Sequence, residues 1–147
     1  MFFGRNLIQK DLMKKLLIKA LLTWFLFIPV AIVNGVVRET VYKPYVGDLP
    51  AHQISCFIGI AAFILLSFLM LKKVVKEIGT SQLLWVGFLM VLMTIIFEFS
   101  FGHFVERLPW ERLLYDYNII KGRLWLLVLL AELVTPLLVK KLLLLKK

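Results

Sequence analysis

The fold is decided by the stretch LLWVGFLMVLMTIIFEFSFGHFVERLPWERLLYDYNIIKGR, residues 83–123. Its first half is an apolar run long enough, as a helix, to cross a hydrocarbon core of about 30 Å. From Glu98 onward the stretch gains a carboxylate, a histidine and then a dense series of charged and aromatic residues. That order is typical of a membrane span whose end reaches the interface.

The whole chain is too apolar for a soluble domain. It has 147 residues, of which 61% are hydrophobic, and a mean hydropathy of +0.90, whereas a soluble domain needs a polar surface. The net charge of +9 would suggest nucleic acid in a soluble protein. Here the basic residues lie between apolar runs, as lipid headgroups and membrane insertion require. We expect residues 1–147 to form one integral membrane domain with no nucleic-acid partner.

Four apolar runs have the length of a membrane span. They cover about residues 20–37, 54–71, 83–104 and 124–139. Because lipid offers no hydrogen bonds to the backbone, these runs must be helices. The fold class is therefore predicted as all-α, a membrane-embedded bundle of four transmembrane helices. A basic, partly amphipathic lead-in over residues 1–19 is expected to lie on the lipid headgroups.

The distribution of lysine and arginine predicts the topology. Twelve of these residues fall in the N-terminal segment, the loop between spans two and three, and the C-terminus, against six in the two other loops. The positive-inside rule then predicts a multi-pass protein of the bacterial inner membrane with both termini in the cytoplasm. Residues 38–53 and 105–123 would face outward.

The outer segment 105–123 has a helical pattern of its own. Apolar and aromatic residues recur at helical spacing from Trp110 to Tyr117, Arg112 and Asp116 form an i, i+4 pair, and Pro109 suits the first helical position. The pattern predicts a short amphipathic helix lying flat on the outer interface between spans three and four, where Trp and Tyr are favoured.

Each predicted span carries a stripe of small and polar residues that should face other helices rather than lipid. These stripes are Thr23, Asn34 and Arg38 in span one; His52, Ser55, Gly59 and Ala62 in span two; Gly87, Thr94, Glu98 and Gly102 in span three; and Trp125, Glu132 and Pro136 in span four. Pro136 should also kink its helix, because it removes a backbone donor.

Two carboxylates lie inside the predicted spans. Glu98 is shallow, and an unpaired charge at that depth is costly, so we expect Glu98 to pair with Arg38 or Arg123 or to stay protonated. Glu132 lies near the middle of span four and is the residue hardest to explain by packing alone. An ionic tie between helices and a proton or cation relay are both open interpretations of these carboxylates.

Metal and nucleophile signals are weak. His52, His103, Glu39 and Glu98 could converge on one divalent ion near the outer rim, but no HxxxH pair lies on one helical face, so no metal is predicted and no cofactor is implied. The sequence has no GxSxG, no Cys–His arrangement and no Gly-rich phosphate loop. Cys56 is interpreted as a small apolar core residue.

A set of short motifs runs through the chain between Asn34 and Pro136. They are Asn34-Gly35, Arg38-Glu39, Ala51-His52-Gln53, Phe97-Glu98, Gly102-His103, Trp110, Asp116-Tyr117-Asn118 and Gly122-Arg123-Leu124-Trp125. In these motifs the chain resembles a group of short bacterial four-span integral membrane proteins with no assigned activity. The resemblance implies the four-span architecture and the importance of these residues, and no reaction.

The predicted function rests on an outer polar cluster. Its members are Asn34, Arg38, Glu39, His52, Glu98, His103, Asp116, Asn118 and Arg123. We expect a non-enzymatic membrane protein in which this cluster engages a lipid headgroup or a partner protein, with Arg38 and Arg123 binding anions and Glu98 setting their spacing.

Two alternatives stay open. The first is a small oligomeric transporter or channel that uses Glu98 and Glu132 for protons or cations. The second is an outer-face lipid-modifying enzyme with His52 or His103 as base. The partners implied are membrane lipid and either a protein partner or a second copy of the chain.

Overall fold

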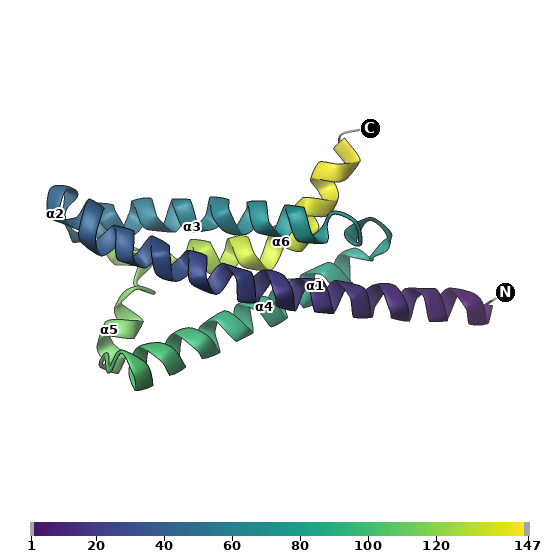
Figure 1. Ribbon diagram of the computed structural model, residues 1–147, viewed down its shortest axis with the longest axis horizontal. Coiled ribbons are helices and arrows are strands. Elements are labelled where there is room, and N and C mark those ends of the chain that lie inside the picture. The colour runs from purple at the N-terminus through teal and green to yellow at the C-terminus, as the bar shows by residue number, and fades with distance from the viewer. Residues whose placement is uncertain (1, 146–147) are drawn as a thin grey trace.

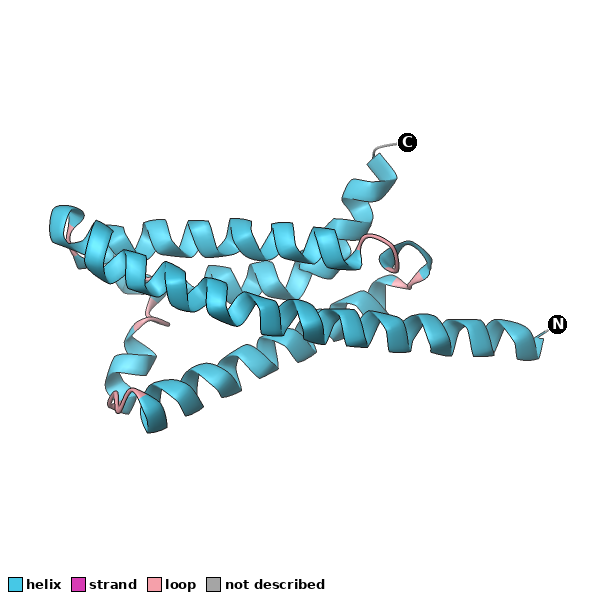
Figure 2. Ribbon diagram, viewed as in Figure 1, coloured by secondary structure: helices cyan, strands magenta, loops and turns pink. Residues whose placement is uncertain are grey.

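The computed structural model of the protein describes residues 2–145, and this part of the chain is helical with short connections and no strands (Figures 1 and 2). The elements in chain order are α1 (Phe2–Val37), η1 (Arg38–Tyr42), α2 (Lys43–Val46), α3 (Asp48–Leu71), η2 (Val75–Glu77), α4 (Thr80–Ser100), η3 (Phe101–Val105), α5 (Trp110–Tyr115), η4 (Ile119–Lys121) and α6 (Trp125–Leu145). The all-α prediction is confirmed.

Three helical segments are long and apolar enough to cross a membrane, as a multi-pass membrane protein requires. They are Leu7–Val46, Asp48–Leu71 and Thr80–Val105. α6 has the same length as α4, 21 residues, but it carries Glu132, Lys140 and Lys141. Because of these charges, the composition of α6 does not by itself show that it crosses a membrane, and the fourth span stays a prediction.

α1 is longer than the sequence pattern predicts. The helix runs without a break from Phe2 to Val37 and continues through η1 and α2, and its N-terminal part extends beyond the other helices (Figure 1). Leu16 is fully buried and belongs to the main hydrophobic core. The segment before residue 20, which the sequence pattern places on the lipid headgroups, is therefore part of the same helix and packs against the protein; where this helix enters a membrane stays a prediction.

The core lies where α1, α3, α4 and α6 approach the connection between α3 and α4. Large apolar side chains from all four helices and from that connection meet there, including Phe27, Phe63 and Met90. α1 packs along α3, α3 along α6 and α6 along α4, whereas α1 and α4 contact each other over a shorter length. The α1–α4 side of the molecule is consequently the least closed.

Small residues allow two close approaches. A Cβ atom on Gly87 of α4 would overlap the backbone carbonyl of Leu133 in α6, and one on Gly102 would lie 2.6 Å from Leu113 Cδ2. Both glycines belong to the predicted stripe of span three, so the expectation that this stripe faces protein is confirmed. Pro136 lies inside α6, and the last turns of α6 bend away from the preceding ones (Figure 1).

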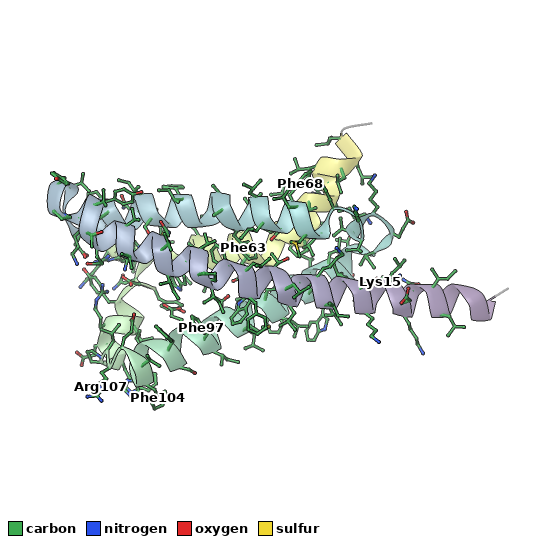
Figure 3. The ribbon with its side chains drawn as sticks, viewed as in Figure 1. Lys15, Phe63, Phe68, Phe97, Phe104 and Arg107 are labelled. Atoms are coloured by element: carbon green, nitrogen blue, oxygen red, sulfur yellow. The ribbon has the colours of Figure 1, made fainter. Side chains whose placement is uncertain are left out.

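The connection from α4 to α6 forms the far end of the molecule. Phe104 and Arg107 lie at its tip (Figure 3), and Arg107 has a positive φ of 56° that turns the chain between η3 and α5. α5 ends at Tyr115, and Pro109 precedes it as the N-cap in an extended conformation. The helix is therefore shorter than predicted, and its position on a membrane interface stays a prediction.

Candidate functional site

Charged side chains from four segments meet at the end of the molecule that carries α2 and α5, here called the polar end. Arg123 is central and buried: its side chain contacts Asp48 of α3 and lies 3.5 Å from Asp116 Oδ1. The same group lies 4.4 Å above the ring of Tyr115. Because the Arg123 guanidinium bridges two carboxylates, it holds the starts of α3 and α6 against the end of α5.

The pairing continues outward from Asp48. Lys43 Nζ lies 3.2 Å from Asp48 and 2.8 Å from Glu39, and Glu39 also accepts from Arg38 Nε at 3.1 Å. Arg112 joins at the other side, 3.1 Å from Asp116, which confirms the predicted i, i+4 pair. Opposite charges thus alternate across the polar end, and most of them are neutralised by one another.

His52 is buried beneath this network, with 2% of its surface exposed. Its Nε2 accepts the backbone N–H of Leu124 at 3.2 Å, and its Nδ1 lies 3.7 Å from Asp116 Oδ1. Because an amide N–H can only donate, the neutral ring carries its proton on Nδ1, facing the carboxylate. Cys56 Sγ also lies 3.4 Å from Nε2, a contact that was not anticipated from the sequence.

Glu98 does not pair with arginine, so the first of the two alternatives expected for it, an ion pair with Arg38 or Arg123, is wrong. Its Oε2 accepts the Tyr117 hydroxyl at 2.5 Å and the Trp125 indole N–H at 2.8 Å. Both arginines that were expected to reach it are bound to other carboxylates. Burial, together with Glu98 itself, raises the pKa of Tyr117, so the phenol stays protonated and can donate.

Glu132 is held in the interior by a chain of hydrogen bonds. Trp24 Nε1 of α1 donates to Thr94 Oγ1 of α4 at 2.9 Å, and Thr94 Oγ1 donates to Glu132 Oε1 of α6 at 2.8 Å. Glu132 has only 3% of its surface exposed. One residue from each of three helices therefore forms a polar tie at the depth of the core.

A cavity of about 760 Å³ joins the polar end to this depth. It is partly open, and its walls come from α1, η1, α2, α3, α4, η3, α5 and α6 and from the connections beside α5. Arg38, Lys43 and Arg112 line it at the polar end, while Trp24 and Phe27, which belong to the hydrophobic core, line it at the other end. Its wall thus changes from charged to apolar along its length.

The cavity gathers part of the predicted cluster. Six members line it, namely Asn34, Arg38, Glu39, His52, Glu98 and Asp116. His103 instead shares a hydrogen bond with the Leu108 carbonyl at 3.0 Å and stacks on Trp110, and Asn118 caps η4. Arg123 lies outside the lining, so the outer polar cluster is not one site.

Several cavity residues were missed by sequence reasoning. Trp24, Phe97, Phe101 and Arg112 line the cavity, but in the sequence they are indistinguishable from lipid-facing aromatics or from a surface ion pair. They can be identified as cavity residues only from the structure, in which α1 and α4 diverge.

The structure gives the weak metal candidates no geometric support. Within residues 2–145 no group of three or more His, Cys, Asp or Glu side chains could hold an ion. His52, Glu39, Glu98 and His103 each have a partner elsewhere.

No protein-family model, curated protein or solved structure matches this chain. The functional argument therefore rests on the geometry of the polar end and the cavity.

Proposed function

We propose that this chain is a four-span protein of the bacterial inner membrane that binds a membrane lipid in the cavity. In this arrangement the chain forms a single membrane domain, α6 is its fourth span and both termini are cytoplasmic. The polar end with α5 lies at the outer interface. The excess of lysine and arginine at the opposite end supports this orientation.

The observation that carries the proposal is the change of character along the cavity wall. A lipid has a charged head and an apolar tail, and the wall offers Arg38 and Lys43 at one end and Trp24 and Phe27 at the other. The volume of about 760 Å³ lies within the range of about 300–1,000 Å³ that ligand sites occupy. We place the entry of the lipid from the bilayer between α1 and α4, because these two helices contact each other over a shorter length than the other neighbouring pairs.

Arg38 is the group we propose for the headgroup phosphate. Only its Nε bonds to Glu39, so within the described residues both terminal nitrogens are left without a protein acceptor. A guanidinium binds phosphate well through paired N–H groups. Arg123 is already engaged by two aspartates, and we assign it a structural role instead of the anion-binding one predicted from sequence.

The proposal is tested by filling the cavity. Gly35 lines it, and a Cβ atom there would have nothing within 4 Å, so Gly35→Leu should occupy cavity space without disturbing the helix. We expect native mass spectrometry of the detergent-purified protein to show bound lipid in wild type and a loss of most of it in Gly35→Leu. The matched control is Val33→Leu, at a 61% exposed position outside the lining. Equal lipid occupancy in all three proteins would refute the proposal.

A proton or cation transporter is the second candidate, because Thr94 both lines the cavity and binds Glu132. In that case Glu132→Gln should abolish flux in proteoliposomes while leaving lipid occupancy unchanged. If the protein only binds lipid, wild type and Glu132→Gln should both show no proton or cation flux, and the variant should keep full lipid occupancy.

A further inference from the structure

We infer that the lipid headgroup carries an ammonium group as well as a phosphate, and that Glu98 binds the ammonium. This inference rests on the proposed lipid site and names the class of lipid: a zwitterionic amphiphile with an amine. In the preferred interpretation of the sequence Glu98 set the spacing of Arg38 and Arg123, and the structure shows that it does not contact them.

Glu98 presents an unused acceptor to the cavity. Both of its hydrogen bonds, from Tyr117 and Trp125, are made to Oε2. In the part of the chain that the structure describes, no donor reaches Oε1 and no basic side chain lies within 4.0 Å of the carboxylate. A half-buried carboxylate at the edge of a membrane is costly without a cation, so a ligand ammonium would complete the site.

Aromatic residues line the cavity together with Glu98, and the indole N–H of Trp125 bonds to its carboxylate. Phe97, Phe101, Trp24 and Trp125 all line the same cavity as Glu98. Phe97 stacks on Phe101 with centroids 5.3 Å apart and meets Trp24 edge-on at 5.8 Å, and Figure 3 shows Phe97 on the inner side of α4. Aromatic faces attract cations and do not attract anions. An ammonium group in this cavity would therefore find aromatic faces as well as the Glu98 carboxylate.

The charges at the polar end of the cavity disfavour a purely anionic head. Beside its three basic residues the lining includes the carboxylates Glu39, Glu106 and Asp116 in addition to Glu98. Glu106 makes no ion pair or hydrogen bond with any described residue through its carboxylate. A headgroup of net charge zero, with its phosphate toward Arg38 and its ammonium toward Glu98, matches this balance better than a headgroup with a net negative charge.

The test compares two lysolipids with the same acyl chain, lysophosphatidylethanolamine and lysophosphatidylglycerol, by titration of the purified protein in native mass spectrometry. Wild type should bind the ethanolamine lipid about tenfold more tightly. Glu98→Gln should reduce this ratio to about one by weakening only the ethanolamine lipid. Glutamine keeps an acceptor oxygen for Tyr117 and Trp125, and unchanged affinity for the glycerol lipid would show that the fold is intact.

The matched control removes a carboxylate at the other end of the molecule. Glu77→Gln, at an exposed position of η2, should leave the ratio of the two affinities at its wild-type value. Suppose that wild type binds the two lysolipids with about equal affinity and that Gly35→Leu weakens the binding of both. The ammonium inference would then be overturned, whereas the lipid site would stand. If Gly35→Leu leaves the affinity of both lipids unchanged, the lipid site itself is wrong and the inference falls with it.

Discussion

Gly87→Ala should separate α4 from α6, because Gly87 is where these helices come closest. The added methyl group would overlap the Leu133 carbonyl oxygen and lie 2.8 Å from its carbonyl carbon and 3.1 Å from its Cα. These atoms belong to the backbone and cannot turn away, so α6 must move by on the order of 1 Å. Overpacking of this kind costs about 1–3 kcal/mol.

The displacement should have a second effect. Glu132 precedes Leu133 in the chain, so moving α6 stretches the 2.8 Å bond from Thr94 to Glu132, whose loss costs about 1 kcal/mol. We expect Gly87→Ala to lower the free energy of unfolding by about 2–4 kcal/mol. The assay is reversible unfolding in mixed detergent micelles with increasing dodecyl sulfate, followed by tryptophan fluorescence.

Gly35→Ala is the matched control, since a Cβ there meets nothing within 4 Å. It should leave the unfolding free energy unchanged within about 0.5 kcal/mol or raise it, because alanine is the better helix former. If Gly87→Ala were as stable as Gly35→Ala, α4 and α6 would not pack at the distance described, and the reasoning would be refuted.

Three other substitutions probe the polar contacts. Thr94→Val should lower stability by about 1–2 kcal/mol, since it leaves Glu132 without its donor, and Thr94→Ser should restore most of the loss; an unaffected valine variant would argue against the tie. Arg123→Lys should lower the midpoint of thermal unfolding, because one ammonium cannot hold two aspartates and cover Tyr115. Tyr117→Phe should be destabilising at neutral pH. Because burial and Glu98 raise the pKa of Tyr117 above its ordinary 10, the contribution of its hydroxyl is complete below that pH and falls as the pH rises. The stability difference between wild type and Tyr117→Phe should therefore shrink above pH 10, and a constant difference would contradict the assignment.

The helices were predictable because hydrophobic length and backbone satisfaction leave no other structure for such runs. Their ends were less predictable. α3 begins at Asp48, before the predicted start of span two, since a polar turn can continue a helix when its charges are paired. α1 begins far before residue 20 because basic side chains on one face do not prevent the other face from packing.

The polar residues were predicted better than their partners. Periodicity placed Thr94, Glu98 and Glu132 on inward stripes, and all three have interhelical hydrogen bonds. It could not show that Tyr117 and Trp125, more than a dozen residues away, would reach Glu98 before any arginine did. Such pairings depend on the path of the connection through α5, which a single sequence leaves open.

Because α1 is continuous, a tilt of this helix would move both of its ends. We take Trp24, where α1 is hydrogen-bonded to Thr94, as the point about which α1 would tilt. At 1.5 Å per residue, one arm of the helix runs about 21 Å from this point to Arg38. The other arm, back to Phe2, is about 33 Å long. A tilt of about 10° that moved the N-terminal tip by about 6 Å would move Arg38 by about 4 Å, which exceeds the length of a hydrogen bond. If α1 moved as a rigid rod, a displacement of its N-terminal part would therefore change the position of Arg38 at the cavity.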